Sequence, residues 1–102
     1  SYRYPATQGQ RDSNEAEIVS SLEAVGATVE CIPSGEGVPD LLVGYKGVNY
    51  LMEVKPEPVK GKVFASAVSL NPKQVLWHST WKGQKAVVRN PKEALAVIGI
   101  EI

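Results

Sequence analysis

The sequence has little of several residue types, and each scarcity excludes a class of protein. It contains a single cysteine, Cys31, so no disulfide can form within the chain, and we expect a cytoplasmic, intracellular protein. It contains a single histidine, His78, and one histidine with one cysteine gives too few ligands for a zinc cluster. No apolar run reaches the roughly 18 residues that a membrane-spanning helix needs, and no signal peptide is visible. We interpret Cys31 as a buried strand thiol and His78 as a packing or surface residue.

The net charge is also zero, because 11 basic side chains balance 11 acidic ones. These charges are unevenly distributed along the chain. Residues 1–54 carry three basic and eight acidic side chains, whereas residues 55–89 carry seven basic side chains and one acidic one. This separation is typical of a phosphate-binding surface beside a cation site, and it is equally typical of a solvated lysine-rich face. Charge alone leaves both interpretations open.

The length and the pattern of apolar residues predict one α/β domain. A chain of 102 residues has room for a single hydrophobic core. Residues 1–11 are polar and rich in turn formers, so we interpret them as an N-terminal arm and residues 12–102 as the folded domain. Hydrophobic periodicity, caps and turns predict helices over residues 12–26, 72–82 and 91–98 and strands over residues 27–32, 40–45, 48–54 and 86–89. The order α-β-β-β-α-β-α indicates a small mixed sheet flanked by helices.

Two of the predicted strands form a hairpin whose geometry follows from the numbering. If Lys46 and Gly47 are the two turn residues, residues that face each other have numbers that add up to 93. Asp40 then lies directly opposite Glu53, with Cβ atoms about 5 Å apart. Lys55 is two residues beyond Glu53 and therefore points to the same face of the sheet. We expect the hairpin to bring two carboxylates and one ammonium group together.

Two carboxylates that face each other across a strand pair repel, so something must compensate their charge. A divalent cation would do so, and Mg²⁺ binds through one or two carboxylates while keeping other positions for water and phosphate. Such a metal can polarise a phosphoryl oxygen and lower the pKa of a bound water, and Lys55 could stabilise charge in the transition state. The alternative is a surface cluster without a ligand. Apolar residues such as Leu41 and Met52, typical of a central strand pair, favour the metal site.

Three segments resemble the VRR-NUC family of small nucleases in the PD-(D/E)xK superfamily. They are Gly-Val-Pro-Asp-Leu-Leu-Val at residues 37–43, Leu-Met-Glu-Val-Lys at residues 51–55, and Leu-Asn-Pro-Lys-Gln at residues 70–74 with Trp77 after it. The resemblance extends over about residues 11–99. Members of this family are common as stand-alone phage or prophage proteins and as C-terminal domains of repair nucleases.

The resemblance implies a restriction-endonuclease-like fold and a set of site residues. It makes Asp40 and Glu53 the metal ligands, Lys55 the catalytic lysine and Gln74 a helix residue that faces the site. The implied cofactor is Mg²⁺, with Mn²⁺ as a substitute. For Gln74, the residues alone are equally compatible with a solvated position on the helix.

The family also places a glutamate of the first helix in the site, and two candidates compete. On a helical wheel Glu15 falls inside the apolar arc, between Leu22 and Val19, whereas Glu17 lies at the edge of that arc. The local pattern of the family, an asparagine, then Glu or Gln, then any residue, then Glu-Ile, matches residues 14–18 and favours Glu17. The resemblance ranks Glu17 slightly ahead, and both stay as candidates.

Lysines and aromatic residues complete the set of candidates. Lys60, Lys62 and Lys73 are the candidates for contact with nucleic-acid phosphates, because the first two lie in a glycine-containing loop just beyond the catalytic lysine. Trp77 and Trp81 are neighbours at i and i+4 of a predicted helix, a spacing more typical of core residues than of a base-stacking platform.

Together these features predict a magnesium-dependent DNA endonuclease that hydrolyses phosphodiesters. Stand-alone relatives resemble Holliday-junction resolvases, so the expected substrate is branched or junction DNA and the expected assembly is a homodimer. The alternative function is a non-catalytic DNA-binding module on the same fold. Such a module is expected to lack one of Asp40, Glu53 and Lys55, all of which are present.

Overall fold

The computed structural model describes residues 13–33, 36–57 and 70–101, which form three helices and four strands. In chain order these are α1 (Ser13–Ala24), β1 (Thr28–Cys31), β2 (Leu41–Tyr45), β3 (Val48–Val54), α3 (Pro72–Thr80), β4 (Lys85–Val88) and α4 (Pro91–Val97). The predicted order α-β-β-β-α-β-α is confirmed. The proposed N-terminal arm, residues 1–11, lies outside the described residues. No helix in the described part of the chain has the length and apolar character needed to cross a membrane.

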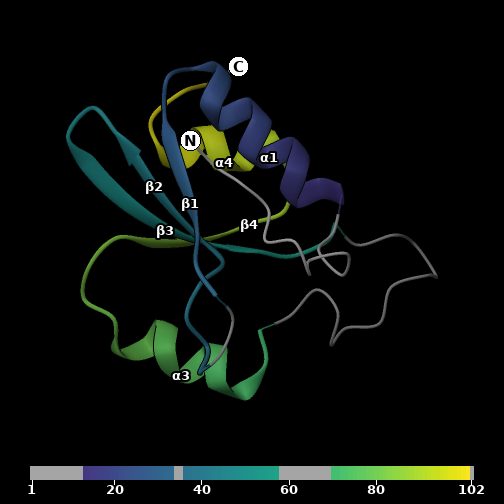
Figure 1. Ribbon diagram of the computed structural model, residues 1–102. Helices are drawn as coiled ribbons and strands as arrows, with labels where there is room; N and C mark the ends of the chain where they lie inside the picture. Colours follow the sequence, from purple (N-terminus) through teal and green to yellow (C-terminus); the bar gives the residue numbers. More distant parts are fainter. Residues whose placement is uncertain (1–12, 34–35, 58–69, 102) are drawn as a thin grey trace.

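The four described strands form one mixed sheet in the order β1-β2-β3-β4. β1, β2 and β3 are antiparallel neighbours, and β4 pairs in parallel with β3. Figure 1 shows α1 and α4 together on one side of the sheet and α3 on the opposite side. This is the predicted architecture, a small mixed sheet flanked by helices.

The register of β2 and β3 is the predicted one. Leu41 pairs with Met52, so the numbers of facing residues add up to 93. Continued by one residue in each strand, this register sets Asp40 against Glu53. The hairpin therefore places the two carboxylates where the numbering predicts them.

The turn between β2 and β3 explains why this register is adopted. Its two residues, Lys46 and Gly47, have φ angles of 51° and 82°. Positive φ at both central residues is the requirement of a type I′ turn, whose twist matches that of the flanking strands. A two-residue turn of this type leaves no freedom to shift one strand along the other.

The hydrophobic core lies between one face of the sheet and the helices α1 and α4. Along β2, buried Leu41 and Val43 flank exposed Leu42, as the period of two requires, whereas the last three residues of β3 are all buried. The core consists of Ile18, Val19, Leu22, Ala27, Val29, Leu41, Val43, Met52, Val54, Val88, Ala94, Leu95 and Ile98. Cys31 lies on β1 as predicted, but it is only half-buried because it ends the edge strand. The opposite face is less well covered, and Leu42 there is 38% exposed.

Helix α3 differs from the prediction in length and in burial. It ends at Thr80 with Trp81 as its C-cap, two residues before the predicted end at residue 82. None of its residues is buried, and Val75 and Leu76 are exposed. The interpretation of Trp77 and Trp81 as core residues is therefore wrong, since Trp81 is 42% exposed. The i, i+4 spacing makes two rings neighbours but does not decide what covers them.

Gly37 sets the distance between the loop before β2 and the start of α3. Its φ of +83° lies in the left-handed region that favours glycine. A Cβ atom at this position would overlap with the carbonyl oxygen of Lys73, in the first turn of α3. The loop that leads into Asp40 therefore packs directly on the backbone of α3, next to Gln74.

We expect Gly37→Ala to destabilise the protein more than Gly26→Ala. Gly26 has a φ of +98°, but a Cβ atom there meets no described atom within 4 Å. Both substitutions carry the cost of a left-handed alanine, about 1–2 kcal/mol. Only Gly37→Ala also forces α3 away from the loop. Urea denaturation measures both free energies of unfolding, and equal losses would show that α3 does not depend on this close approach.

Candidate active site

Asp40 directly precedes β2 and is held through both its backbone and its side chain. Its carbonyl oxygen accepts a hydrogen bond from the N–H of Ile32, and its Oδ2 accepts one from the N–H of Val54, each at 2.8 Å. The second bond takes the place of a backbone bond between the strands. Because Val54 follows Glu53, this bond fixes the Asp40 carboxylate beside that of Glu53.

The capping box of α3 orients Gln74. The N-cap residue, Asn71, accepts a hydrogen bond from the N–H of Gln74, and Oε1 of Gln74 accepts one from the N–H of Asn71, both at 2.9 Å. With its oxygen engaged, the amide presents its NH₂ group to Glu53, and Nε2 donates to Glu53 Oε2 at 3.0 Å. Gln74 therefore faces the site, as the resemblance implies, and is not a solvated helix residue.

Glu53 is a buried carboxyl group, with 3% of its surface exposed. Its Oε2 accepts the bond from Gln74, whereas its Oε1 is buried without a hydrogen-bond partner among the described residues. Burial raises the pKa of Glu53 from 4.5 to about 8, and the neighbouring Asp40 carboxyl group, including its negative charge, adds to the rise. The charge of Lys55 opposes this rise, and that of Glu15 adds to it. In the absence of a cation, burial and the neighbouring carboxylates therefore favour the protonated form of Glu53.

Lys55 follows β3 and is placed by contacts on both sides of its backbone. Its N–H donates to the carbonyl oxygen of Val88 at 3.0 Å, which continues the parallel pairing with β4. Its own carbonyl oxygen accepts a bond from Asn14 Nδ2 at 3.0 Å, and the same amide reaches the carbonyl oxygen of Arg89 at 3.3 Å. Asn14 therefore holds the ends of β3 and β4 against α1. The only sequence signal for Asn14 is its place in the family pattern.

The structure brings Glu15, and not Glu17, to the cluster. Glu15 is 3% exposed, and its charge helps to raise the pKa of Glu53. Glu17 is exposed to solvent. Two residues apart on a helix, the side chains point to nearly opposite sides, so only one can face the sheet. The helical wheel therefore predicts correctly that Glu15 is the buried residue. The local pattern of the family, which ranks Glu17 first, does not.

Of the three lysines expected to contact phosphate, Lys73 is the one that the structure describes. It is exposed in the first turn of α3, one residue before Gln74, and its Nζ lies 3.6 Å from a carboxylate oxygen of Glu36. Lys60 and Lys62 lie outside the described residues. Contact of these lysines with phosphate stays a prediction.

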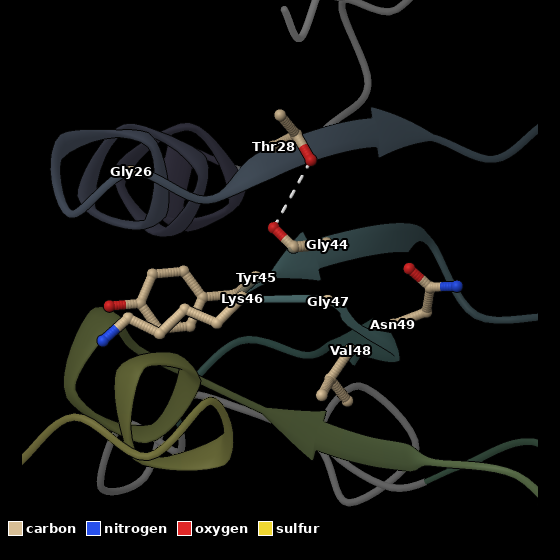
Figure 2. Close-up of a pocket in the computed structure, with 8 residues that line it drawn as sticks. All are labelled: Gly26, Thr28, Gly44, Tyr45, Lys46, Gly47, Val48 and Asn49. Carbon is tan, nitrogen blue, oxygen red and sulfur yellow. Dashed lines mark hydrogen bonds between the residues drawn. The ribbon is translucent and has the colours of Figure 1, made fainter.

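A cavity of about 370 Å³ at the other end of the hairpin is not part of this site. Figure 2 shows its lining around the turn of β2 and β3, where Thr28 Oγ1 donates to the carbonyl oxygen of Gly44 at 3.3 Å. The ammonium group of Lys46 lies 5.3 Å from the ring centroid of Tyr45. None of the lining residues carries a carboxylate, thiol or imidazole, so the cavity offers no side chain of the types that usually bind metals.

The side chains at Asp40 and Glu53 suit a hard divalent cation. Among the described residues, no three His, Cys, Asp or Glu side chains are placed to hold a metal ion together, so a closed zinc-type site is not formed there. Asp40 and Glu53 supply two carboxylates, and Oε1 of Glu53 is a buried oxygen without a described partner. One or two carboxylates are the usual contribution of a protein to a Mg²⁺ site, with water and phosphate supplying the other ligands.

Comparison with solved structures finds a match to a chain described as a VRR_NUC domain. The match has a TM-score of 0.62 and 25% sequence identity, and it covers 82% of this chain and 88% of the other. No family model matches the sequence, and no curated protein matches it. The fold is thus restriction-endonuclease-like, as the resemblance implies, and the similarity supports a nuclease-type domain.

We expect the metal-free protein to lose stability as the pH rises from about 5 to about 8. The pKa of Glu53 is about 8 in the folded state against an ordinary value of 4.5, so the folded state holds one more proton in this range. Rising pH therefore favours unfolding, by on the order of a few kcal/mol.

Two variants isolate this pH dependence. Glu53→Gln cannot ionise and should remove it, whereas Glu17→Gln, at an exposed carboxylate, should retain it. Urea denaturation in EDTA at about pH 5 and about pH 8 measures the change in the free energy of unfolding. Parallel pH profiles for the wild type and Glu53→Gln would contradict the raised pKa.

Proposed function

We propose that this chain, which the structural match supports as a VRR-NUC nuclease domain, is a magnesium-dependent endonuclease that hydrolyses phosphodiester bonds in branched DNA. The observation that carries the proposal is the meeting of Asp40, Glu53 and Gln74, with Lys55 close enough to act on Glu53. One carboxylate oxygen of this group is buried without a described partner. Such a carboxylate pair is costly unless a cation compensates its charge.

Each residue of the cluster has a separate task in this proposal. Asp40 and Glu53 hold the cation, which when bound polarises the phosphoryl oxygen and makes water a better nucleophile. Gln74 occupies Oε2 of Glu53 and so leaves Oε1 for the cation. The ammonium group of Lys55 stabilises the negative charge that develops on the phosphate during attack. Glu15 adds negative charge behind Glu53 and so favours a cation at the site.

The distribution of charge and the symmetry of branched DNA support the proposed substrate. The acidic first half of the chain supplies Asp40 and Glu53, and the basic residues 55–89 begin with Lys55 at the same site. A cation site thus adjoins the segment that carries most of the phosphate-binding lysines. A four-way junction presents two symmetry-related phosphates, and two sites related by a two-fold axis can cut both. Because one chain offers one such site, we propose a homodimer.

The proposed function predicts Mg²⁺-dependent cleavage of a labelled four-way junction and no cleavage in EDTA, with flap and linear duplex DNA as comparison substrates. Asp40→Asn should abolish cleavage, because the amide keeps an oxygen for the N–H of Val54 but loses the negative charge.

Glu15→Gln and Glu17→Gln are a matched pair on α1. The buried Glu15 variant should lose most activity, and the exposed Glu17 variant should stay within about 0.5 kcal/mol of wild-type stability and keep its rate.

Three outcomes would count against parts of this proposal. Cleavage that persists in Asp40→Asn, in a preparation free of contaminating nuclease, would contradict the assignment of the active site. Equal activities of the two α1 variants would remove α1 from that site. Salt-sensitive binding of junction DNA by a wild type that cleaves nothing would instead favour the non-catalytic DNA-binding module.

Light scattering at micromolar concentrations should give about twice the chain mass of 11.0 kDa. We place the interface away from the Asp40–Glu53 side of the sheet, so that both sites stay open to DNA. A strict monomer would leave the nuclease chemistry intact and would make single nicks at flaps or duplex ends the expected activity.

A further inference from the structure

The face of the sheet that carries Glu53 continues into an apolar groove of about 390 Å³. The groove lies where β2 and β3 meet the turn after α3. Its lining combines two leucines, one indole, two side-chain amides and one glycine: Leu42, Leu51, Trp81, Asn49, Gln84 and Gly83. Leu51 is two residues before Glu53 on β3, so the groove begins about 7 Å from that residue on the same face.

Trp81 is held in a fixed orientation even though it is 42% exposed. One face of its indole stacks on Trp77, with ring centroids 4.9 Å apart and an interplanar angle of 16°. The indole also lies close to Gly83, where an added Cβ atom would come within 2.8 Å of Nε1. An exposed aromatic ring that is oriented by its neighbours is well suited to stack on another flat ring.

We propose that this groove binds an unpaired nucleobase of the DNA strand whose phosphate lies at Asp40 and Glu53. The proposal rests on the proposed nuclease function, because the strand is placed by the cation site. The base stacks on the indole of Trp81 and contacts the aliphatic side chains of Leu42 and Leu51. Leu51 in the groove and Glu53 in the site are two residues apart on β3, which corresponds to about 7 Å. A single nucleotide can extend over this distance from its phosphate to its base.

The polar residues around the groove favour a nucleobase over an aliphatic side chain of a protein partner. The amides of Asn49 and Gln84 can each donate and accept hydrogen bonds, as the edge of a base requires. Lys85 lies beside the groove, because it pairs with Leu51 on the neighbouring strand and its Nζ donates to the carbonyl oxygen of Trp81 at 2.8 Å. Its positive charge suits the phosphates on either side of a bound base.

The groove also supplies a reason for selecting branched DNA. A base within a duplex must first be unpaired and unstacked, at a cost in free energy, before it can enter a groove on a protein surface. Bases in a single-stranded gap do not carry the cost of unpairing, and base pairs beside a branch point open more readily than those within a continuous duplex. The groove therefore distinguishes unpaired from paired DNA without reading its sequence, since every base has a flat face.

The test is the binding of three labelled DNAs in EDTA, where no cleavage occurs, by fluorescence anisotropy and tryptophan quenching. They are a duplex with a short single-stranded gap, the same duplex with abasic sites in the gap, and a fully paired duplex. The wild type should bind the gap with intact bases more tightly than the abasic gap. Trp81→Ala should weaken binding to the intact gap about ten- to hundredfold and abolish this preference. Trp81→Phe should restore most of it.

Leu76→Ala is the matched control, because Leu76 is 65% exposed on the same helix and does not line the groove. It should bind all three DNAs as the wild type does. Gly83→Ala should displace the indole without removing it and reduce the preference for intact bases.

The outcomes separate this proposal from the nuclease function. If Trp81→Ala keeps the wild-type preference for intact bases, the groove binds no base, even when the wild type cleaves junctions. If the preference is lost in Trp81→Ala while the wild type cleaves nothing, the base site is supported and only the nuclease function fails. A fall in oligomeric mass for Trp81→Ala, without a change in base preference, would assign the groove to a second copy of the chain and overturn the proposal.

Discussion

The repulsion between two carboxylates facing each other across the β2–β3 hairpin is the constraint on which the site depends. The turn sets the register, so Asp40 and Glu53 cannot move apart. Burial makes their shared charge more costly, and in the metal-free protein this cost raises the pKa of Glu53 to about 8 and favours its protonated form. The hydrogen bond from Gln74 and the positive charge of Lys55 offset part of the remaining cost of the negative charge. In the proposed function, a divalent cation would take the place of this proton.

A small number of contacts between the helices and the strands each place one functional group of the site. Asn14 ties the start of α1 to the ends of β3 and β4, which brings Glu15 to the cluster. The capping box directs Gln74, and the close approach at Gly37 holds α3 near enough for that amide to reach Glu53. Because α3 buries none of its own residues, it contributes to the site and the groove more than to the core.

The parts of this structure that follow from local rules could be predicted from the sequence. The hairpin register follows from a two-residue turn and a period of two, and the burial of Glu15 follows from the helical period. What depends on tertiary contacts could not be predicted. Asn14 donates hydrogen bonds to Lys55 and Arg89, which lie 41 and 75 positions further along the chain. The i, i+4 spacing of Trp77 and Trp81 gives no sign that none of the residues of α3 is buried.

The central claim is that a cation takes the place of the proton on Glu53, and proton release measures it most directly. Calorimetric titration of Mg²⁺ at about pH 7, in two buffers of different ionisation enthalpy, reports the number of protons released per cation bound. Our account predicts release of about one proton by the wild type, because the pKa of Glu53 is about 8 before binding, and none by Glu53→Gln. Binding of Mg²⁺ to the wild type without proton release would contradict it.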